Sequence, residues 1–226
     1  MRMGGVGMGK GFWGYLLDLL FPPRCVFCRK LLPSGSQDIC PSCRDELPWL
    51  EGAAAEQTGE FFSLCASPLR YIDDVRESLH RYKFKGQQGY AQAYGHLVAQ
   101  CVRTHLAGRY DLISWVPLSD RRLKERGYDQ AMLLAMAAAL ELDEVAVETL
   151  RKSRNTNAQS GLSGENARRA NVMGAYEAVD PELVRGKRVL IIDDIITTGS
   201  TISECARTLR TVGAADVVCA TLARAH

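Results

Sequence analysis

The sequence has no apolar run long enough to cross a membrane and no strong excess of either charge. Its longest apolar stretch, residues 12–21 (FWGYLLDLLF), is interrupted by Asp18, whereas a spanning helix needs roughly 20 apolar residues. Phe21-Pro22-Pro23 follows in place of a small-x-small cleavage site, so an amphipathic helix is expected here and not a secretory signal. The net charge of +2 excludes a polycation. We therefore expect a cytoplasmic protein without a membrane span.

The composition that remains is typical of a globular protein. Of the 226 residues, 46% are hydrophobic and 24% are charged, which suits one ordinary domain with a small appendage. No internal repeat longer than the cysteine pairs is evident. Composition predicts four regions: a tail with an amphipathic helix at 1–23, a cysteine-rich ribbon at 24–50, a small polar linker at 51–60, and an α/β domain at 61–226.

Four of the eight cysteines form two Cys-x2-Cys pairs, Cys25 with Cys28 and Cys40 with Cys43. This spacing is typical of a zinc ribbon, in which four thiolates complete a tetrahedral shell and leave no position for catalysis. A four-thiolate iron–sulfur site would use the same ligands and stays open. Disulfides are the less favoured alternative in an intracellular protein. The cysteines without a partner in the sequence are Cys65, Cys101, Cys205 and Cys219.

From residue 61 onward, apolar runs alternate with helical patterns. Helices are expected at Asp73–Tyr82, Tyr94–Val102, Gln130–Leu140 and Ile202–Val212, the first capped by Asp73 or Asp74. Strands are expected at Asp111–Val116, Val145–Leu150, Val172–Ala178, Val189–Ile192 and Val217–Leu222. The run VLII is continuous, as in a parallel strand covered on both faces. Strand, helix and strand at the end of the chain form a βαβ unit, which predicts a doubly wound, mostly parallel α/β sheet.

The segment Val189–Thr201 (VLIIDDIITTGST) leads from a buried strand through two acids into a helix. A helix N-terminus offers unpaired N–H groups, and Gly199 lets the backbone approach a phosphate closely. Carboxylates repel phosphate, so Asp193 and Asp194 are expected to bind ribose hydroxyls or a divalent cation shared with a pyrophosphate. The alternative is an ordinary strand and capped helix with the two acids as turn residues.

Basic residues gather in three further places. Arg121 and Arg122 follow VPLS after a predicted strand, and guanidinium groups match phosphate oxygens bidentately. Lys83 and Lys85 lie in YKFKG, which is either a further basic part of the same site or the exposed end of a helix. Residues 151–171 form a long polar, basic segment, expected to be either a functional loop or a surface linker. Each cluster taken alone is also compatible with a solvated face.

The segment IIDDIITTGST resembles the phosphoribosyl pyrophosphate (PRPP) signature of the type I phosphoribosyltransferases. The resemblance implies that Asp193 and Asp194 hold the ribose 2- and 3-hydroxyls. It implies that the 5-phosphate is cradled by Thr197, Thr198, Gly199, Ser200 and Thr201. Members that act on purines usually have Asp at the position of Thr197, which argues against purine salvage. It further implies a pyrophosphate, expected with Mg²⁺, near Arg121 or Arg122, and a flexible loop at 151–171.

A four-cysteine ribbon before such a domain resembles the ComF family of competence-associated proteins, which includes the GntX-type members. The resemblance covers nearly the whole chain, through LLDLLFPPRCVFC, RYKFKG, VPLSDRRLKERGYDQA, QSGL, ARRANVMGAY and IIDDIITTGST. Two departures are notable. Many members have Asn in place of Asp129, and longer members carry a second cysteine set, of which only Cys65 lies near.

Two functions follow from these patterns. The first is an enzyme that transfers phosphoribosyl from PRPP to an unidentified acceptor, with the resemblance implying a link to DNA uptake. The second is a non-enzymatic nucleic-acid-binding module for transformation or repair that retains a phosphate site. Its partner would be single-stranded DNA or a DNA-uptake or helicase protein. Basic clusters favour the second function, but only Tyr128 places an aromatic ring among them.

Overall fold

The computed structural model describes residues 22–33, 38–154 and 170–225. Contacts divide the chain into two compact units, one ending at Glu46 and the other beginning at Leu47. The predicted N-terminal helix and most of the predicted loop at 151–171 lie outside the described residues. In the ranges that are described, no helix has the length and apolar character that a membrane span requires.

The first unit is a short hairpin followed by a helix. Arg24 and Leu31 form an antiparallel bridge across a turn, and the Cys25 N–H donates to the Lys30 carbonyl oxygen at 2.9 Å. Helix α2 (Pro41–Glu46) follows and begins directly after Cys40. The hairpin and the start of α2 therefore bring the two cysteine pairs together.

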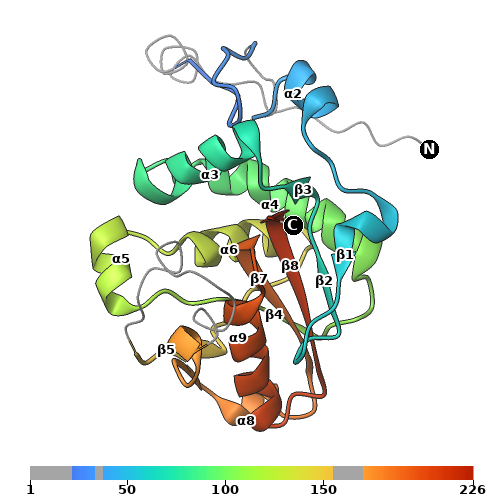
Figure 1. The fold of residues 1–226 in the computed structure, drawn as a ribbon, viewed down its shortest axis with the longest axis vertical. Coiled ribbons are helices and arrows are strands. Elements are labelled where there is room, and N and C mark those ends of the chain that lie inside the picture. The colour runs from blue at the N-terminus through green and yellow to red at the C-terminus, as the bar shows by residue number, and fades with distance from the viewer. Residues whose placement is uncertain (1–21, 34–37, 155–169, 226) are drawn as a thin grey trace, which may run out of the picture. The chain divides into compact units, whose positions relative to one another are not determined.

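The second unit is built on one sheet (Figure 1), whose path runs β1-β2-β8-β7-β4, with β3 also paired to β8. The pairings of β8 with β2, β3 and β7, and of β7 with β4, are parallel, and only β1 pairs antiparallel. The strands are β1 (Glu56–Gln57), β2 (Leu64–Ala66), β3 (Leu69–Arg70), β4 (Leu112–Trp115), β7 (Arg188–Ile196) and β8 (Asp216–Arg224). A separate ribbon pairs β5 (Leu150–Lys152) with β6 (Tyr176–Ala178).

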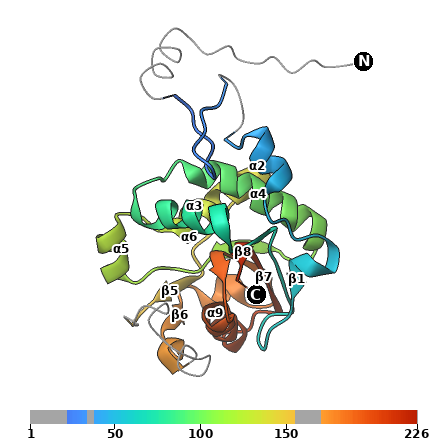
Figure 2. The same cartoon turned by 45° about the horizontal axis from the view of Figure 1, so that its top comes forward.

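Helices cover both faces of this sheet, as predicted for a doubly wound fold. Helices α4 and α6 pack on one face and α9 on the other, as Figures 1 and 2 show. The helices are η1 (Gly52–Ala55), α3 (Asp73–Phe84), α4 (Tyr90–His105), α5 (Asp120–Arg126), α6 (Gln130–Glu141), α8 (Pro181–Val184) and α9 (Ser200–Thr211).

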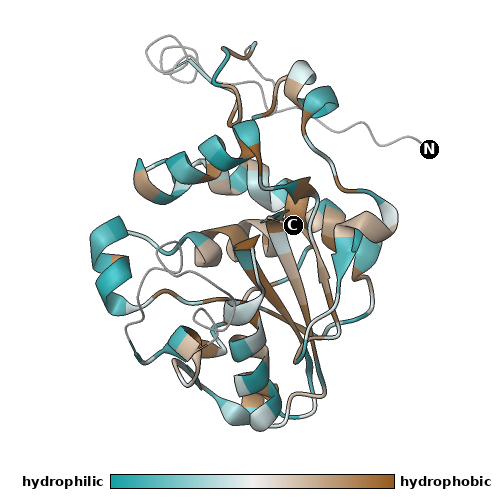
Figure 3. Ribbon diagram, in the orientation of Figure 1, coloured by the Kyte–Doolittle hydropathy of each residue, from teal (hydrophilic) through white to brown (hydrophobic). Residues whose placement is uncertain are grey.

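The two central strands explain why the sequence folds in this way. Val189, Leu190, Ile191 and Ile192 of β7 are fully buried, and so are Val217 through Ala220 of β8. Such strands cannot face water on either side, so helices must cover both faces. Figure 3 shows the contrast between these apolar strands and the largely hydrophilic α5.

The structure differs from the predicted elements in three places. The predicted strands at Val145–Leu150 and Val172–Ala178 are replaced by the short β5 and β6, which pair with each other, and Ala146 makes only an isolated parallel bridge to Ile113 of β4. Neither Asp73 nor Asp74 caps α3: the N-cap is Ile72, and both acids lie in the first turn. Strand β7 continues through both acids to Ile196, four residues beyond the predicted end.

The region around residues 47–60 belongs to the second unit. The predicted ribbon extends to residue 50 and the predicted linker covers 51–60, but the structure divides the chain after Glu46. Residues 51–60 contain η1 and β1, Ala55 is fully buried, and Glu56 pairs with Ala66 of β2. The small and polar composition of residues 51–60 therefore belongs to a short helix and an edge strand.

Helices α4 and α6 pack so closely that one position must be glycine. A Cβ added to Gly95 would lie 2.5 Å from the Cβ of Ala137 and 2.8 Å from its carbonyl carbon. Gly89, which precedes the same helix, has a helical backbone and nothing within 4 Å of an added Cβ.

We expect Gly95→Ala to lower the free energy of unfolding by about 1–3 kcal/mol, because the extra methyl group overpacks the α4–α6 contact. Denaturant unfolding measures this change. Gly89→Ala is the control and should be neutral or stabilise by up to about 1 kcal/mol. Equal stability of Gly95→Ala and the wild type would contradict this close packing.

Candidate functional site

The candidate site lies at the carboxyl end of β7. Asp193 is in register with Thr221 of β8, and Asp194 follows it within the strand. Successive side chains of a strand point to opposite faces. Asp194 accordingly contacts Lys83 of α3, while Asp193 acts electrostatically on Cys205 of α9, on the other face of the sheet. The two acidic side chains therefore lie on opposite faces of the end of β7.

The acid pair is held in an unfavourable electrostatic position. Lys83 Nζ lies 2.8 Å from Asp194 Oδ1, and both side chains are largely shielded from solvent. Burial, and next the charge of Asp194, raise the pKa of Asp193 well above its usual value, although Lys83 acts in the opposite direction. Two adjacent carboxylates resist carrying two negative charges, and one lysine compensates part of that charge.

A glycine in a left-handed conformation shapes the loop after β7. Gly199 has a φ of 76° and directly precedes α9. A Cβ there would meet only ordinary contacts, the closest being Ile196 Cδ1 at 3.7 Å, so the backbone angle and not the space calls for glycine. The hydroxyls of Thr198 and Ser200 are 2.8 Å apart. The first turn of α9 thus follows directly on the loop after β7, and the N-terminus of a helix favours an anion.

A single buried carboxylate fixes the wall that follows β4. Asp129 accepts the Leu118 N–H with Oδ2 at 2.9 Å and the Met132 N–H with Oδ1 at 3.0 Å. Burial raises the pKa of Asp129, although these backbone donors act against the rise. Both oxygens accept hydrogen bonds, which the Asn of many ComF members could not do with its single acceptor. Asp129 therefore ties the loop before α5 to the start of α6.

Helix α5 presents guanidinium groups on this wall. Arg121 pairs with Glu125 at 3.0 Å, and Arg126 bonds the Gln130 side chain at 2.6 Å. Burial and the neighbouring Arg126 lower the pKa of Arg122. The positive charges on this helix repel one another in the absence of an anion.

The β5–β6 ribbon adds Lys152, which belongs to the basic segment predicted as a functional loop, and a tyrosine that we did not predict as a site residue. Lys152 Nζ lies 3.1 Å from the Tyr176 hydroxyl. Burial, followed by repulsion from Arg122, lowers the pKa of Lys152 to about 8. The basic composition of 151–171 pointed toward Lys152, but nothing in the local sequence indicated Tyr176.

The end of α3 is anchored on the start of α6. Tyr82 is buried and donates to the Gln130 carbonyl at 2.8 Å, while the Tyr128 hydroxyl donates to the Tyr82 carbonyl. Tyr128 is buried as well, so the aromatic ring that the sequence places among the basic residues is not available to stack on a base. The exposed ring in this region is Phe84, which has the Arg126 guanidinium 5.0 Å from its centroid.

These walls enclose one cavity of about 730 Å³, a volume typical of small-molecule sites. The predicted residues that line it are Lys83, Arg121, Arg122, Asp193, Asp194, Thr197 and Thr201. Thr198, Gly199 and Ser200 lie in the adjacent loop without lining the cavity, and the exposed Lys85 lies outside it. Lys152 of the predicted basic segment also lines it, and lining residues that we did not predict include His80, Phe84, Arg126, Gln130 and Tyr176. The roles of all these residues stay predictions.

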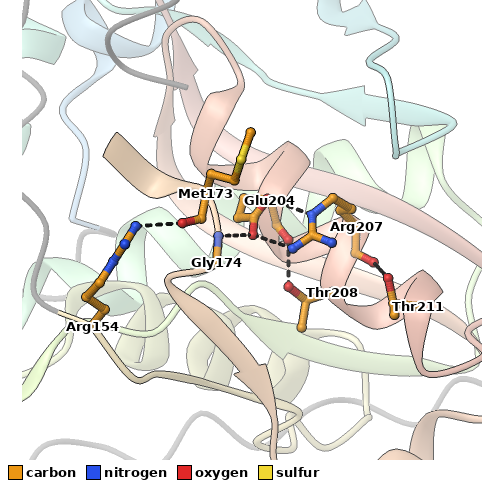
Figure 4. A network of polar contacts seen from close by, with 7 residues as sticks. All are labelled: Arg154, Met173, Gly174, Glu204, Arg207, Thr208 and Thr211. Carbon is orange, nitrogen blue, oxygen red and sulfur yellow. Dashed lines mark hydrogen bonds and ion pairs between the residues drawn. The ribbon is translucent and has the colours of Figure 1, made fainter. Parts of the chain in front are cut away.

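A buried glutamate fastens the chain beside the cavity to α9 (Figure 4). Glu204 accepts the Gly174 N–H at 2.6 Å and two guanidinium N–H groups of Arg207 at 2.7 and 2.8 Å. Arg154 bonds the Met173 carbonyl at 2.6 Å. The residues on either side of 155–169 are thus joined to each other and to α9.

We expect Glu204→Gln to lower the free energy of unfolding by about 1–3 kcal/mol at neutral pH, since it leaves buried donors with a weaker acceptor. Burial opposes ionisation of Glu204, but the bonds from Arg207 and Gly174 outweigh it and hold the pKa below its usual value. A pKa lowered by folding stabilises above the unfolded value, about 4.3, and that stability is lost as the pH falls through the folded value. The difference between variant and wild type should therefore shrink below about pH 4.3 in thermal melts.

The matched control is Glu182→Gln, which removes an exposed Glu–Arg pair of the same i, i+3 spacing. Glu182 lies 2.8 Å from Arg185 and its side chain is 75% exposed, against 7% for Glu204. Its loss should change stability by less than about 1 kcal/mol. A Glu204→Gln effect no larger than that of the control would contradict an anchoring role.

The four ribbon cysteines form a candidate metal centre in the first unit. Their sulfur atoms all lie within 4.8 Å of one another, and those of Cys28 and Cys40 are 3.6 Å apart. Zn–S bonds of about 2.3 Å in a tetrahedron place sulfur atoms about 3.8 Å apart. Iron–sulfur clusters spread their cysteines over several iron atoms, so this spacing favours a single ion. The donors fit structural zinc.

We expect one zinc ion per chain, because one group of four cysteines is so placed in the described residues. Elemental analysis of Cys40→Ser should show its loss, while the second unit keeps its own unfolding transition. Cys65→Ala is the control, since Cys65 lies buried in β2 beside Cys219, and it should retain the metal. Two zinc ions per chain would contradict this assignment.

Two family models match this chain, and the first unit, which ends at residue 46, falls partly within the zinc-ribbon match, which extends to residue 72 in the second unit. Residues 126–226 match the phosphoribosyl transferase domain, and residues 16–72 match the double zinc ribbon domain. Among solved structures, adenine phosphoribosyltransferase from Thermoanaerobacter pseudethanolicus is 19% identical, covering 62% of this chain and 83% of that one, with a TM-score of 0.39. The allosteric regulatory enzyme of purine biosynthesis is 23% identical, covering 58% and 25%, with a TM-score of 0.40.

Several curated proteins are similar over most of their length. DNA utilization protein YhgH of Escherichia coli O157:H7 is 35% identical over 228 residues, covering 88% of this chain and 96% of that protein. Competence protein F of Haemophilus influenzae is 29% identical, covering 89% and 97%. Competence protein ComFC of Bacillus subtilis is 26% identical, covering 88% and 83%. This chain therefore belongs to the ComF family, and it combines a type I phosphoribosyltransferase-like domain with an N-terminal zinc ribbon.

Proposed function

We propose that the protein binds PRPP, or a closely related phosphoribosyl ligand, in the cavity at the end of β7. The observation that carries the proposal is the convergence of three kinds of group on one cavity. Asp193 and Asp194 can accept from hydroxyls, the start of α9 can bind an anion, and cationic side chains line the remaining walls. A ligand that combines a diol with two phosphate groups matches all three.

The charges orient such a ligand in the cavity. Its 5-phosphate would lie at Thr197–Thr201, where the N-terminus of α9 favours an anion. Its ribose hydroxyls would donate to the acid pair, which no phosphate would approach. Its pyrophosphate would extend toward Arg121, Arg122 and Lys152, whose mutual repulsion an anion relieves.

We further propose that the bound ligand reacts by phosphoribosyl transfer. The bond between the anomeric carbon and the pyrophosphate oxygen breaks, and its electron pair leaves with pyrophosphate. An acceptor atom supplies a lone pair to the anomeric carbon and releases its proton to the departing pyrophosphate or to water. The cations of α5 and β5 stabilise the leaving charge. Mg²⁺, when bound with the pyrophosphate, would neutralise further charge, and the carboxyl oxygens of Asp193 suit such a hard ion.

The names of the relatives connect the family with DNA, so we propose a cytoplasmic role in the use or uptake of DNA. Thiolate zinc ligands suit a reducing compartment. A second candidate is a non-enzymatic module for single-stranded nucleic acid, possible partners including a helicase of DNA uptake. Phe84 favours it, because its exposed ring lies beside Arg126 on the cationic wall, where a base could stack.

We expect PRPP with Mg²⁺ to bind the wild type and to bind Asp193→Asn/Asp194→Asn at least about tenfold more weakly, since hydrogen bonds to charged acceptors are lost. Isothermal titration measures both affinities. Ribose 5-phosphate should bind more tightly than 2-deoxyribose 5-phosphate to the wild type only. Thr201→Val should weaken every phosphate ligand, whereas Thr211→Val, at the far end of α9, should not.

Two outcomes would contradict the proposal. Equal PRPP affinity in the wild type and the acid-pair variant would show that the ribose does not bind at Asp193 and Asp194. Equal affinity for ribose and deoxyribose phosphates would separate the acids from the hydroxyls. Binding of single-stranded DNA that weakens steeply with salt and depends on Phe84 and Arg126, without PRPP binding, would favour the second candidate.

A further inference from the structure

The outer face of α6 is apolar along its whole length. Between Gln130 and Glu141 the helix reads AMLLAMAAAL, without a charged residue. An outer stripe, defined by Met132, Leu133, Met136 and Leu140, recurs at helical spacing and points away from the sheet. Met136 is 48% exposed, Leu140 is more exposed still, and Met132 and Leu133 are half-buried. A surface helix normally carries polar residues on this face, so the stripe calls for a cover.

The inner face of the same helix is already complete. Leu134, Ala135 and Ala138 are fully buried, and α6 packs on β4, on β7 and, through Ala137, on Gly95 of α4. Within the described residues, the stripe is therefore additional to the core of the second unit. Helix α6 thus has a second apolar face in addition to the one that packs on the core.

Charges of opposite sign lie at the two ends of the stripe. Beyond the C-terminal end of α6, the segment LDEVAVE carries Asp143, Glu144 and Glu148, all exposed. Beyond the N-terminal end lies α5, which Figures 1 and 2 show to one side of α6. It carries four basic and two acidic side chains and is therefore basic overall, although the charged side chains it exposes are Asp120, Arg121, Lys124 and Glu125. Each end also has an exposed apolar residue, which is Val145 at the acidic end and Leu123 at the basic end.

We propose that the stripe is the dimer interface with a second copy of this chain, in which the two α6 helices pack antiparallel about a twofold axis. A twofold interface must be self-complementary. In the antiparallel arrangement Met136 lies at the axis and Met132 meets Leu140 of the other copy. The acidic end of each helix then meets the basic end of its neighbour. Parallel packing would bring like charges together.

The dimensions fit an interface with an apolar centre and a charged rim. A twelve-residue helix is about 18 Å long, since each residue rises about 1.5 Å. A stable interface buries about 800 Å² on each partner, so the stripe supplies the centre and the charged ends supply the rim. Methionine at the axis can adapt its shape to an identical side chain. This interface goes beyond the proposed PRPP binding and does not depend on it.

Sedimentation equilibrium of the full chain over a range of concentrations tests the proposal. The wild type should dimerise, and Met136→Glu should raise the dissociation constant at least about a hundredfold, because two carboxylates would face each other in an apolar centre. Val179→Glu is the control: Val179 is 46% exposed, close to Met136, but lies after β6. It should dimerise like the wild type, and circular dichroism with zinc content should show that both variants are folded.

Cysteine cross-linking tests the antiparallel geometry. Met136→Cys should form a disulfide with itself across the axis. Met132→Cys and Leu140→Cys should cross-link when mixed and not when alone. The native cysteines are either buried or in the four-sulfur group, so they leave the readout clear.

Three outcomes would overturn the proposal. The first is a wild type that stays monomeric. In that case a photo-cross-linker placed at position 136 would test whether residues 12–21 of the same chain cover the stripe. The second is a Met136→Glu dimer as tight as the wild-type dimer. The third is self-cross-linking of both Met132→Cys and Leu140→Cys, which would indicate parallel helices.

Discussion

Two adjacent carboxylates at the end of a buried strand are the constraint on which the rest of this domain depends. β7 is fully buried up to Ile192, so Asp193 and Asp194 emerge where little water can solvate them. Lys83 offsets part of this cost through its 2.8 Å contact with Asp194. That contact requires α3, more than a hundred residues earlier in the chain, to end beside β7. The bonds of Tyr82 and Tyr128 between α3 and α6 hold it there.

Two other buried carboxylates near the cavity accept hydrogen bonds from backbone N–H groups. Asp129 accepts two of them and fixes the loop before α5, while Glu204 accepts one and fixes the chain next to α9. A carboxylate has two oxygens, so it can join two segments that share no other contact. Asp129 and Glu204 thus position two walls without lining the cavity themselves, whereas Asp193, Asp194 and Glu125 line it.

The sequence predicted what is local and missed what is set by distant contacts. The βαβ unit, the phosphate loop and the cysteine spacing depend on residues close in the chain, and their elements are found within a few positions. Tyr176 and Gln130 reach the cavity through tertiary packing, which no local pattern records. Residues 51–60 contain a short helix and an edge strand, which forms because Ala66 lies opposite Glu56, although their composition is that of a linker. Strand β7 runs on to Ile196 because β8 continues to pair with it.

Charged groups of like sign lie close together around the cavity and shift one another's pKa values, and this bears on what the cavity could bind. Lys83 and Arg121 are paired with acids, but the pKa values of Arg122 and Lys152 are lowered by burial and by neighbouring cations. The pKa of Asp193 is raised by burial and by its neighbouring acid. A plain anion would relieve the cations and worsen the acids, whereas a plain cation would do the reverse. A ligand with hydroxyls at one place and phosphates at another would relieve both at once, which supports the proposed phosphorylated sugar over either simple ion.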